Sequence, residues 1–222
     1  MSINQKIEAS LLAFNTNDET ILQAQLNKMQ KAGIDIIHYD VMDNVFVPNT
    51  AFDVEFLDLI FLKGMKSNVH FMVQHPLKYI KRFLLHPCNC IIFHPECTNK
   101  LFASYLLNKI KKANVKCGLA FKPQTDLNKY KKLIKKCDYV TIMGVNPGFG
   151  GQKFMENETM NNLKVINEIK KELNPNLIIQ LDGGVNFEVV KKTAKYVDNF
   201  ISGSFLIKLE NPKDFVETVK KI

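Results

Sequence analysis

The sequence predicts an α/β fold in which eight parallel strands, each followed by a helix, close into a (β/α)8 barrel. Short apolar segments rich in β-branched residues alternate with longer amphipathic segments along the chain, a pattern typical of βαβ units and a parallel sheet. Eight such units within 222 residues favour a closed barrel over an open doubly wound sheet. No linker, low-complexity tract or charge block divides the chain, so we expect residues 1–222 to form a single domain.

The expected strands are distributed over the whole chain. They comprise residues 7–12, 34–40, 67–73, 90–94, 115–121, 139–143, 177–182 and 200–203. Helical segments follow them, for example residues 18–32, 101–113 and 157–172. The longest irregular segments, residues 41–52 and 146–155, follow the second and sixth strands. Both leave the carboxyl end of a strand, where barrels carry their active sites and where long loops are often functional.

The composition is that of a folded chain, with 46% hydrophobic and 23% charged residues. No segment approaches the roughly 20 apolar residues of a membrane span, and residues 1–6 lack the apolar run of a signal peptide. The five cysteines form no CxxC pair, which favours reduced thiols over a disulfide framework. We therefore expect a cytoplasmic protein with no membrane partner.

The net charge of +8 comes mostly from lysine-rich helical segments such as residues 131–136. A basic surface can bind nucleic acid or a phosphorylated substrate. Because no nucleic-acid-binding motif accompanies the charge, we interpret these lysines as solvated helix faces and expect no nucleic-acid partner.

Two imidazoles and two carboxylates lie at the ends of three expected strands. His38 and Asp40 share one face of the second strand because strand side chains alternate. His70 lies on the third strand, and Asp182 ends the seventh. A histidine taken singly is more often structural, but the set together favours a site for one divalent metal ion. Its nitrogen and oxygen donors suit Zn²⁺ first, with Mn²⁺, Fe²⁺ and Co²⁺ as alternatives.

The same two carboxylates have a chemical logic beside a metal. Inverting a carbon next to a carbonyl requires a base on one face and an acid on the other, with a Lewis acid to stabilise the enediolate between them. Asp40 and Asp182 come from well-separated strands and can flank such a planar intermediate. Alternatively, Asp40 is only a ligand and Asp182 only begins the turn at Gly183-Gly184. The spacing leaves both interpretations open.

Glycine clusters follow the last strands and the sixth strand. Gly183-Gly184 follows the seventh strand, and Gly203-Ser204 follows the eighth, the two positions where barrels often bind phosphate. Residues 147–152 read PGFGGQ. Three glycines in four residues are costly to order, so this segment is interpreted as a lid over a phosphosugar, with a plain flexible loop as the alternative.

These segments together resemble the ribulose-phosphate 3-epimerase family. Residues 38–49 read HYDVMDNVFVPN and resemble the family's HxDVMDGxFVPN, and residues 69–73 (VHFMV) resemble its VHLMV strand. Residues 93–96 match FHxE, residues 146–152 match NPGFGGQ, and Asp182-Gly183-Gly184 and Gly203-Ser204 complete the set. The resemblance spans residues 10–204, and the combination is specific although no single motif is.

The resemblance implies a metal-dependent isomerase of the pentose phosphate pathway. Such an enzyme interconverts D-ribulose 5-phosphate and D-xylulose 5-phosphate by proton transfer at C3 through an enediolate. The implied metal ligands are His38, Asp40, His70 and Asp182, with Asp40 and Asp182 as the acid/base pair. The implied contacts to the phosphorylated ketose are Ser10, Met42, His70, Met72, Met143, Gly148, Phe149, Gly150, Gly151, Gly183, Gly184, Gly203 and Ser204. We expect a homo-oligomer.

Three positions depart from the family pattern. Asn44 replaces the usual Gly, Glu8-Ala9-Ser10 replaces the usual proline-serine pair, and Gly144 stands where Ser or Thr is common. Asn also tolerates a left-handed backbone conformation. None of these changes removes a candidate ligand or acid/base residue.

Three other functions remain open at this point. The first is an epimerase of another ketose phosphate, such as allulose 6-phosphate, which turnover of hexulose and pentulose phosphates would distinguish. The second is a metal-free phosphate-binding barrel enzyme, such as a decarboxylase or synthase, which a metal assay would distinguish. The third is a catalytically inactive barrel acting as a basic binding protein, which salt-dependent nucleic-acid binding would reveal.

Overall fold

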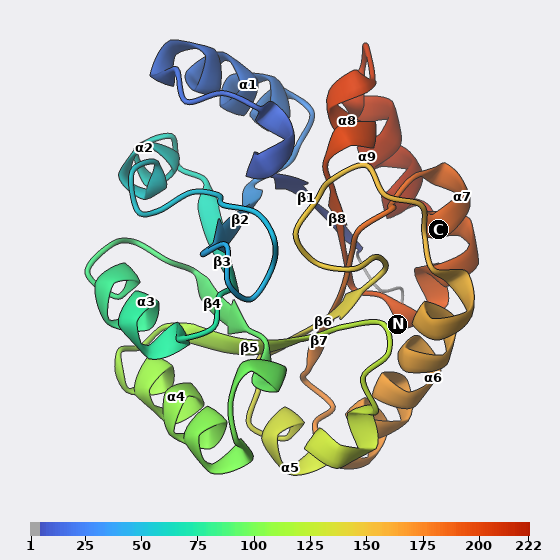
Figure 1. Ribbon diagram of the computed structural model, residues 1–222. Coiled ribbons are helices and arrows are strands. Elements are labelled where there is room, and N and C mark those ends of the chain that lie inside the picture. Colours follow the sequence, from blue (N-terminus) through green and yellow to red (C-terminus); the bar gives the residue numbers. More distant parts are fainter. Residues whose placement is uncertain (1–4) are drawn as a thin grey trace.

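The computed structural model describes residues 5–222 and contains a closed barrel of parallel strands in sequential order, surrounded by helices (Figure 1). Residues 1–4, on which part of the signal-peptide prediction rests, lie outside the described residues. The strands are β1 (Lys6–Ser10), β2 (Ile36–Met42), β3 (Lys66–Met72), β4 (Cys90–Phe93), β5 (Lys116–Phe121), β6 (Tyr139–Met143), β7 (Ile178–Asp182) and β8 (Asn199–Ser202). The barrel closes by parallel pairing of β8 with β1.

The predicted barrel is confirmed, and each expected strand lies within two residues of an observed one. The first strand ends earlier than expected. After Ser10 the chain enters the 3₁₀ helix η1 (Leu11–Phe14), whose Leu11 and Phe14 are buried. Apolar residues therefore continue past the strand end, which is why the sequence pattern overestimates its length.

Helices cover the outside of the barrel. They are α1 (Glu19–Lys31), α2 (Leu57–Leu62), α3 (Pro76–Phe83), α4 (Lys100–Lys112), α5 (Lys131–Ile134), α6 (Glu156–Leu173), α7 (Phe187–Thr193), α8 (Ser204–Lys208) and α9 (Pro212–Lys220). Further 3₁₀ helices are η2 (Pro95–Cys97), η3 (Leu127–Tyr130) and η4 (Ala194–Tyr196). None of the helices within residues 5–222 has the length and apolarity that crossing a membrane requires. The five cysteines are free, as expected.

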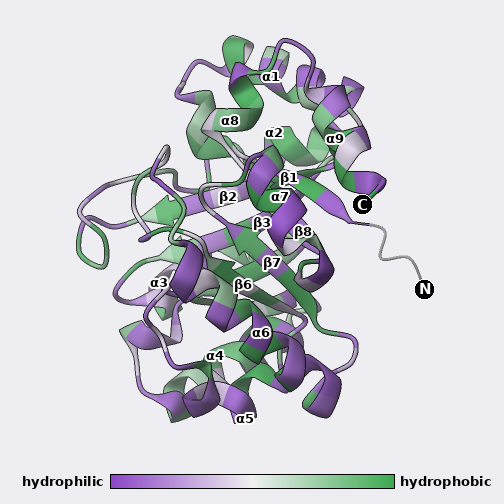
Figure 2. Cartoon of the chain, turned by 90° about the vertical axis from the view of Figure 1, so that its right-hand side faces the viewer, coloured by the Kyte–Doolittle hydropathy of each residue, from purple (hydrophilic) through white to green (hydrophobic). Residues whose placement is uncertain are grey.

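Helix α1 illustrates how the sequence sets these elements. The Asp18 carboxylate accepts the backbone N–H groups of Thr20 and Ile21 and so caps the helix. Buried side chains then recur on one face of the helix: Leu22, Leu26 and Met29. Figure 2 shows the result for the whole chain, with mainly hydrophobic strands and hydrophilic residues on the surrounding helices.

Alternation along the strands separates an outer layer from the barrel interior. On β3, Val69 and Phe71 belong to the main apolar core between strands and helices, so Asn68 and His70 lie on the interior face. The register between β2 and β3 pairs Asp40 with His70 and Met42 with Met72. Polar and sulfur-containing side chains are thus stacked inside the barrel toward the carboxyl ends of its strands.

The loop after β2 is held in place by Asp43. Its carboxylate accepts the backbone N–H groups of Val45 and Phe46 through one oxygen, each at 2.9 Å. The other oxygen accepts the N–H of Gln74, after β3, at 2.7 Å. Asn44 has a positive φ of 56°, so the left-handed conformation expected where the family has Gly is present. The mouth of the barrel near β2 and β3 is therefore organised by one carboxylate.

Candidate active site at the barrel mouth

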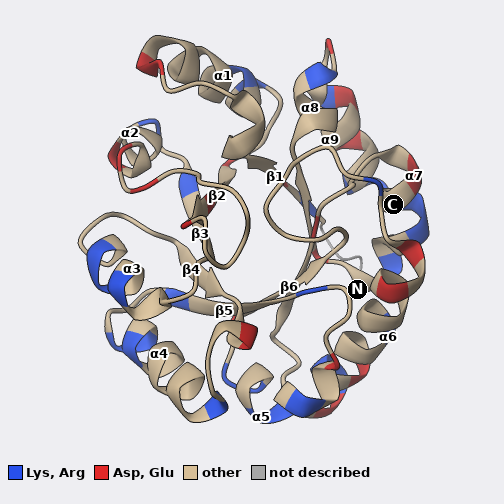
Figure 3. Cartoon of the chain, in the orientation of Figure 1, with Lys and Arg blue, Asp and Glu red and all other residues tan. Residues whose placement is uncertain are grey.

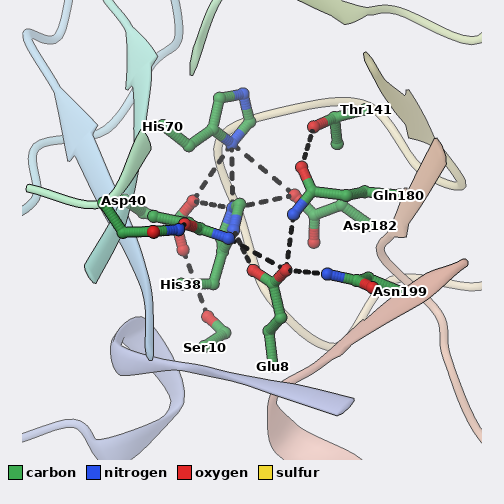
Figure 4. A network of polar contacts seen from close by, with 11 residues as sticks. Glu8, Ser10, His38, Asp40, His70, Thr141, Gln180, Asp182 and Asn199 are labelled. Carbon is green, nitrogen blue, oxygen red and sulfur yellow. Dashed lines mark hydrogen bonds and ion pairs between the residues drawn. The ribbon is translucent and has the colours of Figure 1, made fainter. Parts of the chain in front are cut away.

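The structure brings together the four side chains predicted as metal ligands. His38 and Asp40 come from β2, His70 from β3 and Asp182 from β7, and Figure 4 shows them converging inside the barrel. One ligand atom of each lies within 4.8 Å of all the others. Both histidines are fully buried, whereas the Asp182 side chain is 15% exposed.

The separations between these atoms fit a tetrahedral metal ion. His38 Nε2 lies 3.2 Å from His70 Nδ1, 3.4 Å from Asp40 Oδ1 and 3.5 Å from Asp182 Oδ2. His70 Nδ1 lies 3.3 Å from Asp40 Oδ1 and 3.6 Å from Asp182 Oδ2. Tetrahedral ligands bonded at about 2.0–2.2 Å are about 3.3–3.6 Å apart. The donor set and its spacing therefore suit a divalent ion of the Zn²⁺ type.

The two carboxylates of the cluster also favour a positive charge between them. Burial alone lowers the pKa of His38, but the carboxylates of Asp40 and Asp182 outweigh it, so the pKa is raised well above its usual value. Burial alone raises the pKa of Asp40, but His38 and His70 outweigh it and hold the pKa well below its usual range. Without a metal, positive charge on an imidazole compensates the carboxylates, and a divalent ion can take over that role.

His70 is connected outward to a second histidine and a carboxylate. Its Nε2 lies 3.0 Å from His94 Nε2, and His94 Nδ1 lies 3.5 Å from Glu96 Oε2. Glu96 is fixed by the backbone N–H of Lys122 at 3.0 Å and the hydroxyl of Thr125 at 2.6 Å. Burial lowers the pKa of His94 even though Glu96 opposes this. A neutral His94 can accept a hydrogen bond from His70 through Nε2, with its Nδ1 facing Glu96.

A cavity of about 200 Å³ opens above the cluster. Ser10 Oγ donates to Asp40 Oδ2 at 3.1 Å within it. His70 is fully buried and does not line the cavity. The other predicted substrate contacts all line it, as do both acid/base candidates: Ser10, Asp40, Met42, Met72, Met143, Gly148, Phe149, Gly150, Gly151, Asp182, Gly183, Gly184, Gly203 and Ser204.

The end of the cavity near β7 and β8 is formed largely by backbone. Gly183 and Gly184 follow β7, Gly203 follows β8, and Ser204 begins α8. Among residues 5–222, no Lys or Arg lines the cavity. Figure 3 shows these basic residues mostly on the surrounding helices, such as α3 and α4. An anion bound here would therefore meet main-chain and hydroxyl donors rather than cationic side chains.

The glycine-containing segment after β6 covers one side of the cavity. Asn49, from the loop after β2, donates its side-chain N–H to the carbonyl of Gly148 at 2.8 Å. The Gln152 amide donates to the carbonyls of Asn146 and Phe149 at 2.6 and 2.9 Å. Gly148 has a φ of 120°, and a Cβ there would lie 3.1 Å from Val47 Cβ. The segment is thus braced internally and tied to the opposite loop.

Sequence comparison assigns this barrel and cluster to one family. The model of the "Ribulose-phosphate 3 epimerase family" matches residues 6–207. The chain belongs to the ribulose-phosphate 3-epimerase family. It is therefore an epimerase, an enzyme of the isomerase class, and the family implies a phosphorylated sugar as substrate.

Curated ribulose-phosphate 3-epimerases from several bacteria resemble the chain over most of its length. The relative from Mycoplasma genitalium is 37% identical over 207 residues, 92% of this chain and 93% of the relative. The one from Buchnera aphidicola (subsp. Acyrthosiphon pisum) is 36% identical over 203 residues, 90% of this chain and 88% of the relative.

Solved structures that resemble the chain include tryptophan synthase from Mycobacterium tuberculosis. It has a TM-score of 0.70 and 13% identity, covering 99% of this chain and 93% of that one. The α subunit of tryptophan synthase from Campylobacter jejuni has a TM-score of 0.64 and 16% identity, covering 100% of this chain and 96% of that one. At this identity the likeness shows the barrel fold alone.

The structure explains one departure from the ribulose-phosphate 3-epimerase pattern and places another inside the barrel. A Cβ at Gly144 would lie 2.3 Å from the carbonyl oxygen of Gly183 and 3.0 Å from the ring of Phe154. This epimerase can therefore hold only glycine at position 144 in its present backbone. The other departure is Glu8, whose side chain is fully buried inside the barrel.

Sequence reasoning missed several polar residues beneath the epimerase site. His94 and Glu96 are part of the FHxE segment, but no role was expected for them. Glu8 enters the sequence analysis only as a departure from the family pattern. A carboxylate between Ile7 and Ala9 in an apolar strand nevertheless indicates a buried charge that needs polar partners.

Proposed function

We propose that the chain is a metal-dependent ribulose-phosphate 3-epimerase that interconverts D-ribulose 5-phosphate and D-xylulose 5-phosphate. The observation that supports this most is the cluster of His38, Asp40, His70 and Asp182, with neighbouring ligand atoms 3.2–3.6 Å apart. Its two carboxylates also line the cavity where a sugar would bind. A metal-free barrel enzyme would not need such a set.

The four cluster residues would hold one divalent ion per chain. Two nitrogen and two oxygen donors in near-tetrahedral spacing favour Zn²⁺, with Fe²⁺, Mn²⁺ and Co²⁺ as alternatives. When bound, the ion supplies Lewis acidity for the negative charge that develops on the substrate oxygens.

Asp40 and Asp182 would move the proton at C3. Each places one oxygen near the histidine nitrogens, and its second oxygen would be free to act on a sugar in the cavity. Two other strands, β1 and β8, separate β2 from β7 along the barrel wall, so the two carboxylates approach a bound sugar from different directions. One would remove the proton from one face of the planar enediolate and the other would return it on the opposite face. Ser10 would orient Asp40 through its hydrogen bond to Oδ2.

The remaining cavity residues would bind and enclose the substrate. Met42, Met72 and Met143 offer a soft apolar wall that excludes water from the enediolate. Backbone groups at Gly183-Gly184 and Gly203-Ser204 would receive the phosphate. Phe149 and its neighbouring glycines would form a lid.

We also propose a single catalytic domain that acts as a cytoplasmic homo-oligomer. The last helix, α9, contacts β1, which supports one domain, and the five free cysteines suit a reducing compartment. On α4, Leu101, Phe102 and Tyr105 are exposed close together, with the rings of the last two stacked 5.6 Å apart, which supports an apolar contact between subunits. A sedimentation coefficient corresponding to a monomer would contradict the oligomer.

A coupled epimerase assay on D-ribulose 5-phosphate, with the metal content of the same sample measured, tests the proposed function. We expect turnover to D-xylulose 5-phosphate and one divalent ion per chain. D-Allulose 6-phosphate serves as the comparison substrate, and a higher kcat/KM on it would replace the proposed substrate with a hexulose phosphate. Absence of turnover on both, with metal bound, would refute epimerisation.

A further inference from the structure

A carboxylate lies inside the barrel directly beneath the four candidate metal ligands. Glu8 comes from the middle of β1 and is completely buried, and Figure 4 shows it below His38. Burying an ionisable group is costly unless it has polar partners. Among residues 5–222, no Lys or Arg forms an ion pair with it. Its position inside the barrel therefore depends on other donors.

One oxygen of Glu8 is saturated with amide donors. Oε1 accepts side-chain N–H groups from Asn68 at 3.0 Å, Gln180 at 2.6 Å and Asn199 at 2.7 Å. These residues stand on β3, β7 and β8. Three strands besides its own thus hold the carboxylate in one orientation.

Two of these amides are themselves fixed. The carbonyl oxygen of Asn68 accepts from the Asn89 side chain at 2.6 Å, and that of Gln180 accepts from the Thr141 hydroxyl at 2.8 Å. Their N–H₂ groups consequently must face Glu8. The barrel interior, rather than the metal site, determines where the Glu8 carboxylate points.

The other oxygen of Glu8 faces a metal-ligand histidine. Oε2 lies 3.7 Å from His38 Nδ1. Within the described part of the chain, neither atom has a hydrogen-bond partner. The opposite ring nitrogen, His38 Nε2, is the atom that lies in the metal cluster. An imidazole that binds a metal through Nε2 carries its ring proton on Nδ1, and a carboxylate is the natural acceptor for that proton.

We propose that Glu8 is a positioning residue for the metal site: it accepts the Nδ1–H of His38 and so fixes the tautomer and ring orientation in which Nε2 binds the ion. The inference rests on the proposed metal-dependent function. Histidine ligands commonly donate their second N–H to a carboxylate, and loss of such a partner costs 10–100-fold in metal affinity. Through the ring nitrogen that lies outside the cluster, His70 reaches a carboxylate only by way of His94, whereas His38 faces Glu8 directly.

Glu8→Gln tests this inference because it changes one group only. The glutamine carbonyl oxygen can still accept the three amide donors, so its N–H₂ group must face His38 Nδ1. If the glutamine turned over, its N–H₂ group would instead oppose Asn68, Gln180 and Asn199. When His38 Nε2 binds a metal ion, two donors therefore face each other. We expect Co²⁺ and Zn²⁺ to bind the metal-free variant about 10–100-fold more weakly than the wild-type protein, measured by Co²⁺ absorption and competition.

Thr141→Val is the matched control. It removes a hydroxyl from the same buried network, where it donates to Gln180, without contacting His38. It should lower thermal stability and leave the metal affinity within about twofold of wild type, since Asn68 and Asn199 still hold Glu8 beside His38. An equal loss of affinity in both variants would show a merely structural role for Glu8 and would overturn the proposal.

A measurement on the wild-type protein keeps the proposal testable if Glu8→Gln does not fold. In the zinc-loaded protein, the Nδ1–H proton of His38 should resonate downfield in the manner of an imidazole N–H bound to a carboxylate. An ordinary shift for this proton, or wild-type metal affinity in folded Glu8→Gln, would overturn the role of Glu8 while leaving the metal site intact. A wild-type protein that binds no divalent ion would instead refute the proposed metal site.

Discussion

Asp40→Asn separates proton transfer from metal binding at the candidate site. Asp40 Oδ1 is the atom near the imidazole nitrogens of His38 and His70, at 3.4 and 3.3 Å, and Oδ2 accepts the hydroxyl of Ser10 at 3.1 Å. An asparagine keeps a carbonyl oxygen at the position of Oδ1. Its N–H₂ group takes the position of Oδ2 and can donate to the Ser10 hydroxyl, because a hydroxyl also accepts. The variant retains the shape of the site and loses the capacity to exchange a proton.

The expected loss is large. A positioned general acid or base contributes about 10²–10⁴-fold, so kcat for epimerisation should fall by this factor, equivalent to about 3–5 kcal/mol of transition-state stabilisation. A neutral amide also binds a cation less tightly than a carboxylate, so the rates are compared at saturating metal. Asp182→Asn should behave similarly, because Asp182 holds the corresponding place on β7.

Solvent-deuterium exchange distinguishes the two carboxylates. Each metal-loaded variant is incubated with each pure epimer in D₂O, and a single remaining base should exchange the C3 proton of one epimer only. Asp40→Asn and Asp182→Asn should act on different epimers. Ser10→Ala is the control, since it removes one hydrogen bond to a charged group, worth about 1.5–3 kcal/mol, and leaves both bases. Near-normal epimerisation by either Asn variant, or exchange by both into the same epimer, would refute the reasoning.

Three further outcomes are expected. Chelation should abolish activity, and one divalent ion per chain should restore it; full activity in a metal-free sample, checked by elemental analysis, would contradict the site. Gly148→Ala should lower kcat/KM about tenfold or more, since its φ is 120° and a Cβ would crowd Val47, whereas Gly150→Ala, whose Cβ meets no atom within 4 Å, should lower it less. Burial raises the pKa of Asp43, but the N–H groups of Phe46, Gln74 and Val45 outweigh it and lower the pKa below 3.8. The stabilisation by Asp43 is therefore present above pH 3.8 and lost as the pH falls below it. The difference in Tm between wild type and Asp43→Asn should therefore shrink in acid, and a difference that grew would contradict this account.

The sequence was sufficient to predict that His38, Asp40, His70 and Asp182 come together, because three of the four lie on two neighbouring strands. Alternation puts His38 and Asp40 on one face of β2, and parallel register puts Asp40 beside His70 on β3. Asp182 followed from the position of the turn after β7. The barrel architecture then brings the carboxyl ends of these strands together.

The network under the cluster could not be predicted in the same way. Glu8 contacts Asn68, Gln180 and Asn199, which are 60, 172 and 191 residues away in the chain. Period-two alternation shows that Glu8 lies opposite its neighbours in β1, but it gives no information on which polar groups from other strands occupy the same depth. Likewise, Asn49 and Gly148 are 99 residues apart and meet only because two loops cross the same cavity.

The absence of Lys and Arg from the cavity lining within residues 5–222 has a consequence for inhibitor design. If the main chain at Gly183-Gly184 and Gly203-Ser204 receives the phosphate as proposed, fixed dipoles recognise it at short range, and formal charge pairing, which salt screens, contributes little. Neutral mimics with correctly spaced acceptor oxygens are therefore reasonable substitutes for the phosphate in this pocket. In that arrangement, resistance could not arise through loss of a single cationic side chain, because the proposed phosphate contacts come from the backbone.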